Sequence, residues 1–239
     1  PEEETIIKKD ANGKRIDYVD DRFTNGMRDD LRAFNNMLRQ TNIGTDAIDL
    51  RYKHDPTNIT VKRIFQGEGG GGRFYGGFWE NMPKLDRLKL TLEGRPVVEL
   101  DYAAIHPTIT YAMAGISLID DPYLIEGCER NEVKKAFLVL FNCDSREQAV
   151  KAIRSFGVKN VEQLIGIIEQ KHEAIKNNFY NPGFGMHLQN MDAWLAEKII
   201  KRLTEEGIVC LPIHDSFITQ KTHEAALRAA MEDSFYEIF

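Results

Sequence analysis

The segment Gly207–Glu224, GIVCLPIHDSFITQKTHE, carries the most informative pattern in this sequence. Its first half is almost continuously apolar, His214 and Asp215 interrupt it, and Phe217 and Ile218 resume the apolar character. This pattern predicts two strands joined as a hairpin, with His214 and Asp215 at or near the bend. Burial of an unpaired carboxylate is costly, so Asp215 is expected to have a partner, a hydrogen-bond cage or a metal.

Asp101 is the best candidate partner for Asp215. It ends another β-branched, apolar segment, VVELD, and the residues after it turn away from strand character. Two strand-end carboxylates brought side by side repel each other, and a divalent cation removes that repulsion. Hard oxygen ligands favour Mg²⁺ or Mn²⁺, and two such ions about 3.5–4 Å apart support in-line displacement at phosphorus. Taken alone, an aspartate at a strand end is more often a cap or turn residue than a catalytic one.

Length and composition are ordinary for a globular protein. The chain has 239 residues, of which 42% are apolar and 28% charged, with a net charge of −6. No apolar run approaches the roughly 20 residues that span a bilayer, and the start lacks the apolar block of a signal peptide. We expect a cytoplasmic protein without membrane contact and with three reduced cysteines. The missing initial Met and a helix-like end suggest a domain of a longer protein.

Helical and strand-like patterns alternate along the chain. The first fifty residues are expected to be helical, with Met27, Leu31, Phe34 and Leu38 on one stripe. Strands are predicted at residues 59–65 and 96–102, and the glycine-rich segment 66–84 is expected to be an irregular loop. Helices are predicted at residues 129–141, 160–179 and 192–207, the last with Asp192 as its N-cap.

Three segments resemble, in the same order, motifs of family A DNA polymerases. GRFYGGFWENMPKLDR (72–87) is similar to the segment with Arg and then N-(I/L)-P before motif A. VVELDYAAIHPTI (97–109) resembles motif A, and PIHDSFIT (212–219) resembles motif C, which phage-type single-subunit RNA polymerases share. The resemblance implies an α+β fold: a polymerase palm-type antiparallel sheet with packed helices and a reduced helical fingers lobe.

The resemblance also implies a division of the chain. Residues 1–60 would form an N-terminal helical segment, either thumb-like or a linker, and residues 61–127 the first part of the palm. Residues 128–180 would form the reduced fingers with a motif B-like helix. Residues 181–239 would form the second part of the palm.

The resemblance assigns the metal site to the two aspartates. Asp101 and Asp215 would hold two Mg²⁺ ions, with Mn²⁺ as an alternative, and the backbone carbonyl of Tyr102 would help. His214 and Ser216 would flank this site near the primer terminus.

Nucleotide and nucleic-acid contacts are carried over in the same way. His106 would crowd the ribose 2′-OH and favour deoxynucleotides, or would be only a polar residue before Pro107. Arg130 and Lys134 are four positions apart, hence on one helix face, and would bind the triphosphate, with Lys135 as the alternative to Lys134. Phe137 is also assigned to the nucleotide site, although it lies one step out of register with the aromatic residue of motif B. An amphipathic surface helix is the other interpretation of this segment.

The glycine-rich segment would contact the primer–template. Arg73, Tyr75 and Asn81 are the residues assigned to it, because glycines allow backbone to approach phosphates and aromatic rings pack on sugars or bases. The alternative is that the aromatic residues Phe74, Phe78 and Trp79 anchor the segment on the core.

Together these features predict a template-directed DNA polymerase that uses dNTPs and a primer–template, with further domains or accessory replication proteins as partners. Alternatives are a single-subunit-type RNA polymerase or primase-like enzyme, a metal-dependent phosphohydrolase, and an inactive polymerase-derived module that binds nucleic acid. The setting is open between phage replication, a mobile element and a defence system.

Overall fold

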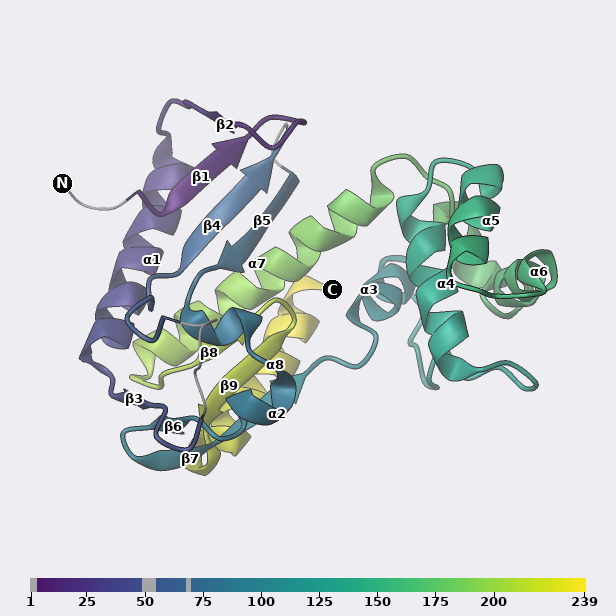
Figure 1. The fold of residues 1–239 in the computed structure, drawn as a ribbon. Coiled ribbons are helices and arrows are strands. Elements are labelled where there is room, and N and C mark those ends of the chain that lie inside the picture. Colours follow the sequence, from purple (N-terminus) through teal and green to yellow (C-terminus); the bar gives the residue numbers. More distant parts are fainter. Residues whose placement is uncertain (1–3, 49–54, 68–69) are drawn as a thin grey trace. The chain divides into compact units, whose positions relative to one another are not determined.

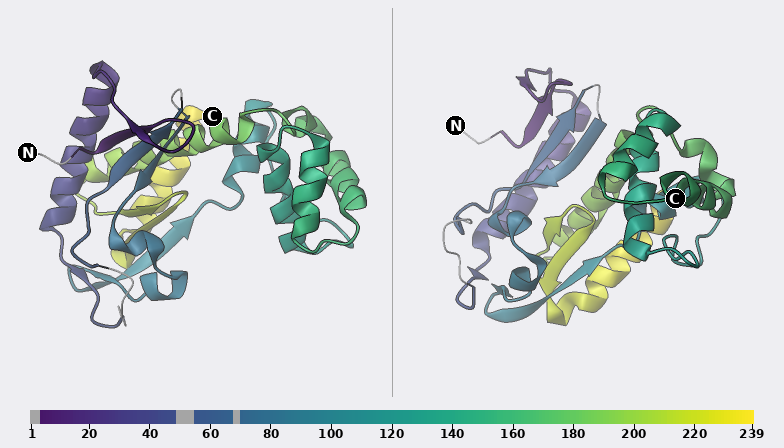
Figure 2. Two further views of the ribbon diagram at one scale, coloured as in Figure 1. Left: turned by 45° about the horizontal axis from the view of Figure 1, so that its top comes forward. Right: turned by 45° about the vertical axis from the view of Figure 1, so that its right-hand side comes forward.

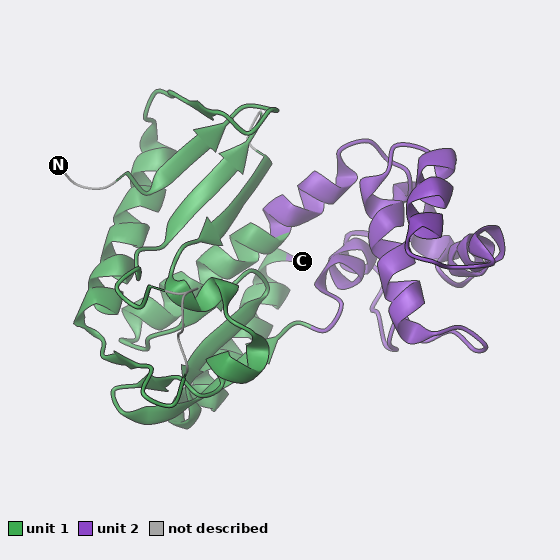
Figure 3. Ribbon diagram, in the orientation of Figure 1, with its two compact units in different colours: residues 1–102, 192–238 green, residues 103–191, 239 purple. Residues whose placement is uncertain are grey.

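The computed structural model describes residues 4–48, 55–67 and 70–239. The chain forms two compact units, shown in Figure 3. Unit 1 comprises residues 1–102 and 192–238, and unit 2 comprises residues 103–191 with residue 239. Apart from residue 239, the chain therefore leaves unit 1 once and returns to it. The predicted functional boundaries at residues 60, 127 and 180 stay predictions.

Unit 1 contains the two sheets of the fold (Figure 1). The first has the strand order β2-β1-β4-β5, with β1 and β4 parallel and the other pairs antiparallel. The second has the order β3-β6-β7-β9-β8, and all its described pairs are antiparallel. The strands are β1 (Ile6–Lys9), β2 (Arg15–Ile16), β3 (Ile43–Gly44), β4 (Lys62–Gln66), β5 (Gly70–Tyr75), β6 (Thr91–Leu92), β7 (Arg95–Asp101), β8 (Leu211–Ile213) and β9 (Ser216–Gln220).

Helices complete both units and confirm the expected α+β class. In unit 1, α1 packs against β1, and α8 packs against β7 and β9 (Figures 1 and 2). Its helices are α1 (Arg22–Gln40), η1 (Phe78–Asn81), α2 (Lys84–Arg87), η3 (Lys221–His223) and α8 (Glu224–Ile238). Unit 2 contains α3 (Ile105–Met113), α4 (Arg130–Asn142), α5 (Arg146–Ser155), α6 (Val161–Lys171) and η2 (Glu173–Asn178). Helix α7 (Phe184–Glu205) continues from unit 2 into unit 1.

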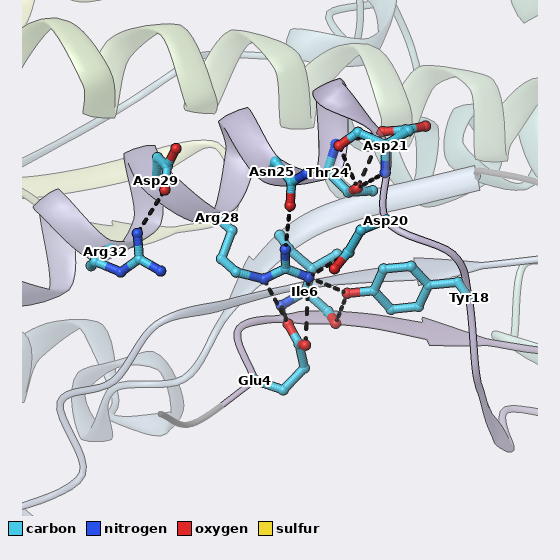
Figure 4. Close-up of polar contacts among 10 residues, drawn as sticks. All are labelled: Glu4, Ile6, Tyr18, Asp20, Asp21, Thr24, Asn25, Arg28, Asp29 and Arg32. Carbon is cyan, nitrogen blue, oxygen red and sulfur yellow. Dashed lines mark hydrogen bonds and ion pairs between the residues drawn. The ribbon is translucent and has the colours of Figure 1, made fainter. Parts of the chain in front are cut away.

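Helix α1 confirms the predicted stripe at Leu31, Phe34 and Leu38, which are buried, whereas Met27 is only half-buried. Asp21 caps its start: the carboxylate accepts a hydrogen bond from the Thr24 amide at 2.8 Å, and the Thr24 hydroxyl accepts one from the Asp21 amide at 2.8 Å. Figure 4 shows this cap beside a polar network centred on Arg28. That network ties the helix to the N-terminal segment, because the Arg28 guanidinium bonds carboxylates of that segment.

The prediction that the first fifty residues are helical is wrong after α1, where Ile43–Gly44 form β3, and also in the segment before α1. Strands β1 and β2 form an antiparallel hairpin there. Asp10 accepts hydrogen bonds from the amides of Asn12 and Lys14 at 2.9 and 2.8 Å, and Gly13 has a φ of 80°. The Asn12-Gly13 pair is a local turn signal, so the sequence contained the information for this turn.

The prediction of an irregular glycine-rich loop is also wrong, because residues 70–75 form strand β5. Gly72 has a φ of 76°, and a Cβ atom there would lie 2.5 Å from Cε1 of Phe65. The register shifts between Ile64 and Phe65 on the paired strand. The glycine therefore makes room for an aromatic ring across a bulged strand pair.

Helix α7 begins at Phe184, so the prediction of Asp192 as its N-cap is wrong. Asp192 lies inside the helix and is buried. The predicted end is confirmed: the Ile208 amide donates to the Leu203 carbonyl at 2.8 Å, and Gly207 adopts a φ of 72°. Asp192 resembled a cap by residue type, but its partner lies on another element.

The predicted thiols are free, and burial raises the pKa of Cys210 to about 12. Within the described parts of the chain, no helix combines the length and the apolar character required to cross a bilayer.

Candidate active site

The structure brings Asp101 and Asp215 to the same end of the second sheet. Asp101 is the last residue of β7 and is paired with Ser216, the first residue of β9. The Tyr102 amide donates a hydrogen bond to the Asp215 carbonyl at 3.3 Å. Asp215 stands in the two-residue turn between β8 and β9, so the predicted hairpin and its bend are confirmed.

The turn that carries Asp215 is strained and is supported from the side. His214 has a φ of 56°, in the left-handed region that costs a side-chain-bearing residue energy. Its ring packs edge-on against Tyr75, with centroids 5.6 Å apart. The Trp79 indole donates to the Pro212 carbonyl at 3.2 Å. Elements β5 and η1 therefore fix the position of the turn.

Glu99 is a buried carboxylate that was not among the predicted site residues. Its side chain is 1% exposed and lies two residues before Asp101 on the same face of β7. Arg87 donates to it from Nε at 2.9 Å and from Nη2 at 2.7 Å, and the Ser216 hydroxyl donates at 2.8 Å. Burial raises the pKa of Glu99, but these bonds outweigh it and hold the pKa below its usual value.

The Glu99 bonds link α2, β7 and β9 at the end of the sheet that carries Asp101 and Asp215. Ser216, which was predicted to flank the metal site near the primer, donates its hydroxyl hydrogen bond to Glu99. A charged residue inside an apolar strand was the available sequence signal, the same signal that pointed to Asp101.

Asp101 differs from Glu99 because it faces solvent. Its side chain is 58% exposed, and Oδ2 lies 3.4 Å from Nζ of Lys84, the first residue of α2. The same ammonium group lies 3.9 Å from Oε1 of Glu99. Asp101 is therefore accessible to a ligand, whereas Glu99 serves the framework.

Arg73 forms an ion pair with Asp192 beside the turn. Nε lies 3.1 Å from Oδ1, Nη2 pairs with Oδ2, and the Asp192 side chain is 3% exposed. Burial lowers the pKa of Arg73, but Asp192, and with it the charge of Asp215, raises it above the usual value. Arg73 thus holds a positive charge within electrostatic range of Asp215.

The oxygen donors at the sheet end fit a Mg²⁺ ion that completes its coordination with water and substrate. Within residues 4–48, 55–67 and 70–239, His, Cys, Asp and Glu side chains form no group of three or more suited to a metal. Mg²⁺ typically takes one or two carboxylates and keeps waters or phosphate oxygens for the rest. Asp101 and Asp215, with the Tyr102 carbonyl, supply donors of this kind.

Asn81, which was also assigned to the primer–template, is the last residue of η1 and is exposed. The aromatic residues Phe74, Phe78 and Trp79 are all buried, which supports the interpretation that they anchor the segment on the core.

In unit 2, Arg130 and Lys134 share one face of α4, as predicted. Their cationic groups lie 5.4 and 6.0 Å from the centroid of the Tyr123 ring. Arg130 also pairs with Asp121 at 2.6 Å, and Lys135 is exposed.

Phe137 and His106 occupy different surroundings in unit 2. Phe137 is fully buried and packs against Phe141 and Phe179, with ring centroids 5.1 and 5.4 Å away. It is therefore a core residue here and not a surface for stacking a base. His106 lies half-buried in the first turn of α3, and its carbonyl accepts a bond from the Thr110 hydroxyl at 2.8 Å.

A cavity of about 340 Å³ beside α1 contains none of the predicted site residues. It is lined by Glu4, Thr5, Asp20, Arg28, Arg32, Asn35, Arg39 and Thr60. Arg28 bonds Asp20 at 2.8 Å and Tyr18 at 3.1 Å, and Arg32 pairs with Asp29 at 2.6 Å (Figure 4). These pairs make the cavity a charge-compensated part of the N-terminal framework.

Comparison with known proteins gave no family model, curated protein or solved structure that matches this chain.

Proposed function

We propose that this chain is a palm-type, template-directed DNA polymerase that transfers nucleotides from dNTPs to a primer 3′-OH. The observation that carries the proposal is the placement of Asp101 and Asp215 at one end of adjacent antiparallel strands. Two carboxylates from distant parts of a chain, one of them solvent-exposed, suit divalent ions that bridge protein and triphosphate. The motif order of the sequence and the antiparallel sheet with α8 on it agree with this proposal.

In this mechanism the aspartates would hold the cations, and the framework around the aspartates would keep their geometry. Mg²⁺, when bound, would lower the pKa of the primer 3′-OH and offset charge on the triphosphate. Glu99 fixes Ser216 and Arg87, which keeps β7 and β9 in register where the carboxylates leave the sheet. Arg73, whose charge is already balanced by Asp192, interacts electrostatically with Asp215 and helps to hold that part of the site in place.

Unit 2 would supply the reduced fingers. Arg130 and Lys134 on one face of α4 suit the phosphates of an incoming nucleotide, because both side chains carry charge-assisted donors. His106, in the first turn of α3, would act on the sugar. Base stacking by Phe137 is not part of the proposal, because that ring is in the core.

Primer extension tests this function directly. We expect wild-type protein with Mg²⁺ to extend a primer on a template, and to use dNTPs in preference to rNTPs when each set is offered alone. Asp215→Asn keeps the size of the side chain but removes its charge, and should lower the rate by about 10³-fold or more. Asp86→Asn is the matched control, since Asp86 pairs with Lys89 on the surface of the same unit.

The outcomes separate the alternatives. Extension by wild type and by Asp86→Asn, with none by Asp215→Asn, supports the polymerase. Preference for rNTPs would favour an RNA polymerase or primase-like enzyme. Metal-independent binding of primer–template without extension would contradict the enzyme and favour a binding module.

A further inference from the structure

Lys84 lies close to two carboxylates, Glu99 and Asp101, that differ in how many other hydrogen bonds they accept. Glu99 is buried and already accepts three hydrogen bonds, from Arg87 and Ser216. Asp101 is 58% exposed, and Lys84 donates to its Oδ2 at 3.4 Å. The ammonium group therefore acts chiefly on Asp101, while Glu99 at 3.9 Å holds it nearby.

We propose that Lys84 is a built-in counter-ion of Asp101, which a divalent cation has to displace from that carboxylate. The inference rests on the proposed function in so far as Asp101 is a metal ligand. A cation on Asp101 would take the same oxygen lone pairs and would lie within a few ångströms of the ammonium, where like charges repel. Lys84 thus weakens the affinity of the substrate-free site for metal.

The ammonium group of Lys84 has a second carboxylate, Glu99, close enough to hold it when it leaves Asp101. A lysine side chain is long and flexible, and Nζ already lies within 4 Å of Glu99, as well as of Asp101. After displacement the ammonium remains beside the cation, held by the charge of Glu99. There it favours a triphosphate that arrives with its metal. The same residue therefore lowers metal affinity without substrate and raises it when an anionic substrate is bound.

Manganese binding measures this effect without any synthesis. Free Mn²⁺ can be followed by electron paramagnetic resonance while it is titrated into wild type and Lys84→Gln, with and without dATP. Without nucleotide, we expect Lys84→Gln to bind Mn²⁺ at least about fivefold more tightly, which is the effect of one unit charge at 4 Å in water. With dATP the order should reverse, so that wild type binds the metal–nucleotide complex more tightly.

The chain offers a matched control in Lys89. Its side chain is 51% exposed, compared with 52% for Lys84, and it pairs with Asp86 at 2.7 Å. Lys89→Gln changes the net charge equally and should leave the Mn²⁺ affinity within twofold of wild type. Lys84→Arg keeps the charge and should restore weak binding. In a protein that carries Asp101→Asn, the further change Lys84→Gln should no longer alter the Mn²⁺ affinity.

Three results would overturn the inference: unchanged affinity in Lys84→Gln, equal tightening in Lys89→Gln, or Mn²⁺ binding that is indifferent to Asp101→Asn. Its failure is distinct from that of the proposed function. If wild type extends the primer but Lys84→Gln leaves the Mn²⁺ affinity unchanged, only the inference about Lys84 is contradicted. Selective tightening in Lys84→Gln, with no extension by wild type, supports the counter-ion and contradicts the polymerase.

Discussion

Unit 1 and unit 2 bury their polar groups in different chemical states. Unit 1 buries ions as pairs: Arg73 with Asp192, Arg87 with Glu99, and Arg63 with Glu197 at 2.7 Å. Unit 2 buries His172, which is 1% exposed and lies in an aromatic cluster, its ring 4.7 Å from that of Phe137. Burial lowers the pKa of His172 to about 4, so its imidazole is neutral at pH 7.

The buried polar groups therefore have different roles in the two units. A buried ion pair gains little stability overall, but losing one partner is costly, so such pairs hold charge at fixed positions. They do so in the unit where Asp101 and Asp215 meet. A neutral imidazole is satisfied by ordinary hydrogen bonds, here with the Tyr111 hydroxyl at 2.8 Å and the Pro122 carbonyl at 2.9 Å. Unit 2 therefore relies on packing.

The largest expected effect comes from breaking a pair in unit 1. Asp192→Asn leaves the Arg73 guanidinium without its buried counter-charge and should lower the free energy of unfolding by about 3 kcal/mol. Urea unfolding followed by tryptophan fluorescence measures this, because both tryptophans, Trp79 and Trp194, belong to unit 1.

Two variants bracket that measurement. Asp86→Asn, at an exposed pair, should cost less than about 0.5 kcal/mol. The double variant Arg73→Met, Asp192→Leu should recover most of the loss, since apolar residues can replace a buried pair. A loss below about 1 kcal/mol in Asp192→Asn would remove the contrast between the units.

Acid should weaken unit 2 through His172. Its folded pKa of about 4 lies below the value of 6.5 for a free side chain, so the unfolded chain takes up the proton first. The stabilisation is complete above pH 6.5 and is lost as pH falls from 6.5 towards 4, by about 2–3 kcal/mol between pH 7 and 4.5. Urea unfolding monitored by far-ultraviolet circular dichroism at both pH values tests this.

His172→Gln serves as the reference for that experiment, because it removes the imidazole and leaves every carboxylate in place. Its unfolding free energy should depend on pH less than that of wild type by the same 2–3 kcal/mol. Identical pH profiles for the two proteins would show that the imidazole is not the titrating group.

The smallest effect is expected at the turn of unit 1. His214→Gly relieves a left-handed conformation worth about 1–2 kcal/mol, against about 0.5–1 kcal/mol of added chain entropy in the unfolded state. Both His214→Gly and His214→Ala lose the Tyr75 contact, but only the alanine variant keeps the strain, so we expect the glycine variant to be more stable than the alanine variant by up to about 1 kcal/mol. Thermal unfolding of the three proteins ranks them, and a glycine variant less stable than the alanine variant would refute the strain.

Sequence patterns predicted the features that depend on residues close together in the chain. The hairpin around Asp215, the strand that ends at Asp101 and the buried stripe of α1 all follow from periodicity and turn chemistry. Asp192 did not, because its partner Arg73 is 119 positions away and no local pattern encodes that contact.

Strand β5 and Glu99 were missed for different reasons. Glycine disfavours strands on its own, but at Gly72 the positive φ and the nearby Phe65 ring both favour a residue without a side chain. Glu99 offered the same signal as the aspartates, a charge in an apolar strand, but its buried partners Arg87 and Ser216 come from two other elements. The catalytic and nucleotide-binding roles stay predictions.

The order of elements along the chain has a consequence for biosynthesis. Strand β7 ends at Asp101, but its neighbour β9 begins at Ser216. At about 5–20 residues per second, a ribosome adds the β9 residues roughly 6–25 s after those of β7. Unit 2 is almost wholly one contiguous segment, so it can fold in that interval while β7 lacks its neighbour. The junction of Asp101 with Asp215 can therefore form only after all of residues 103–191 in unit 2 have been synthesised.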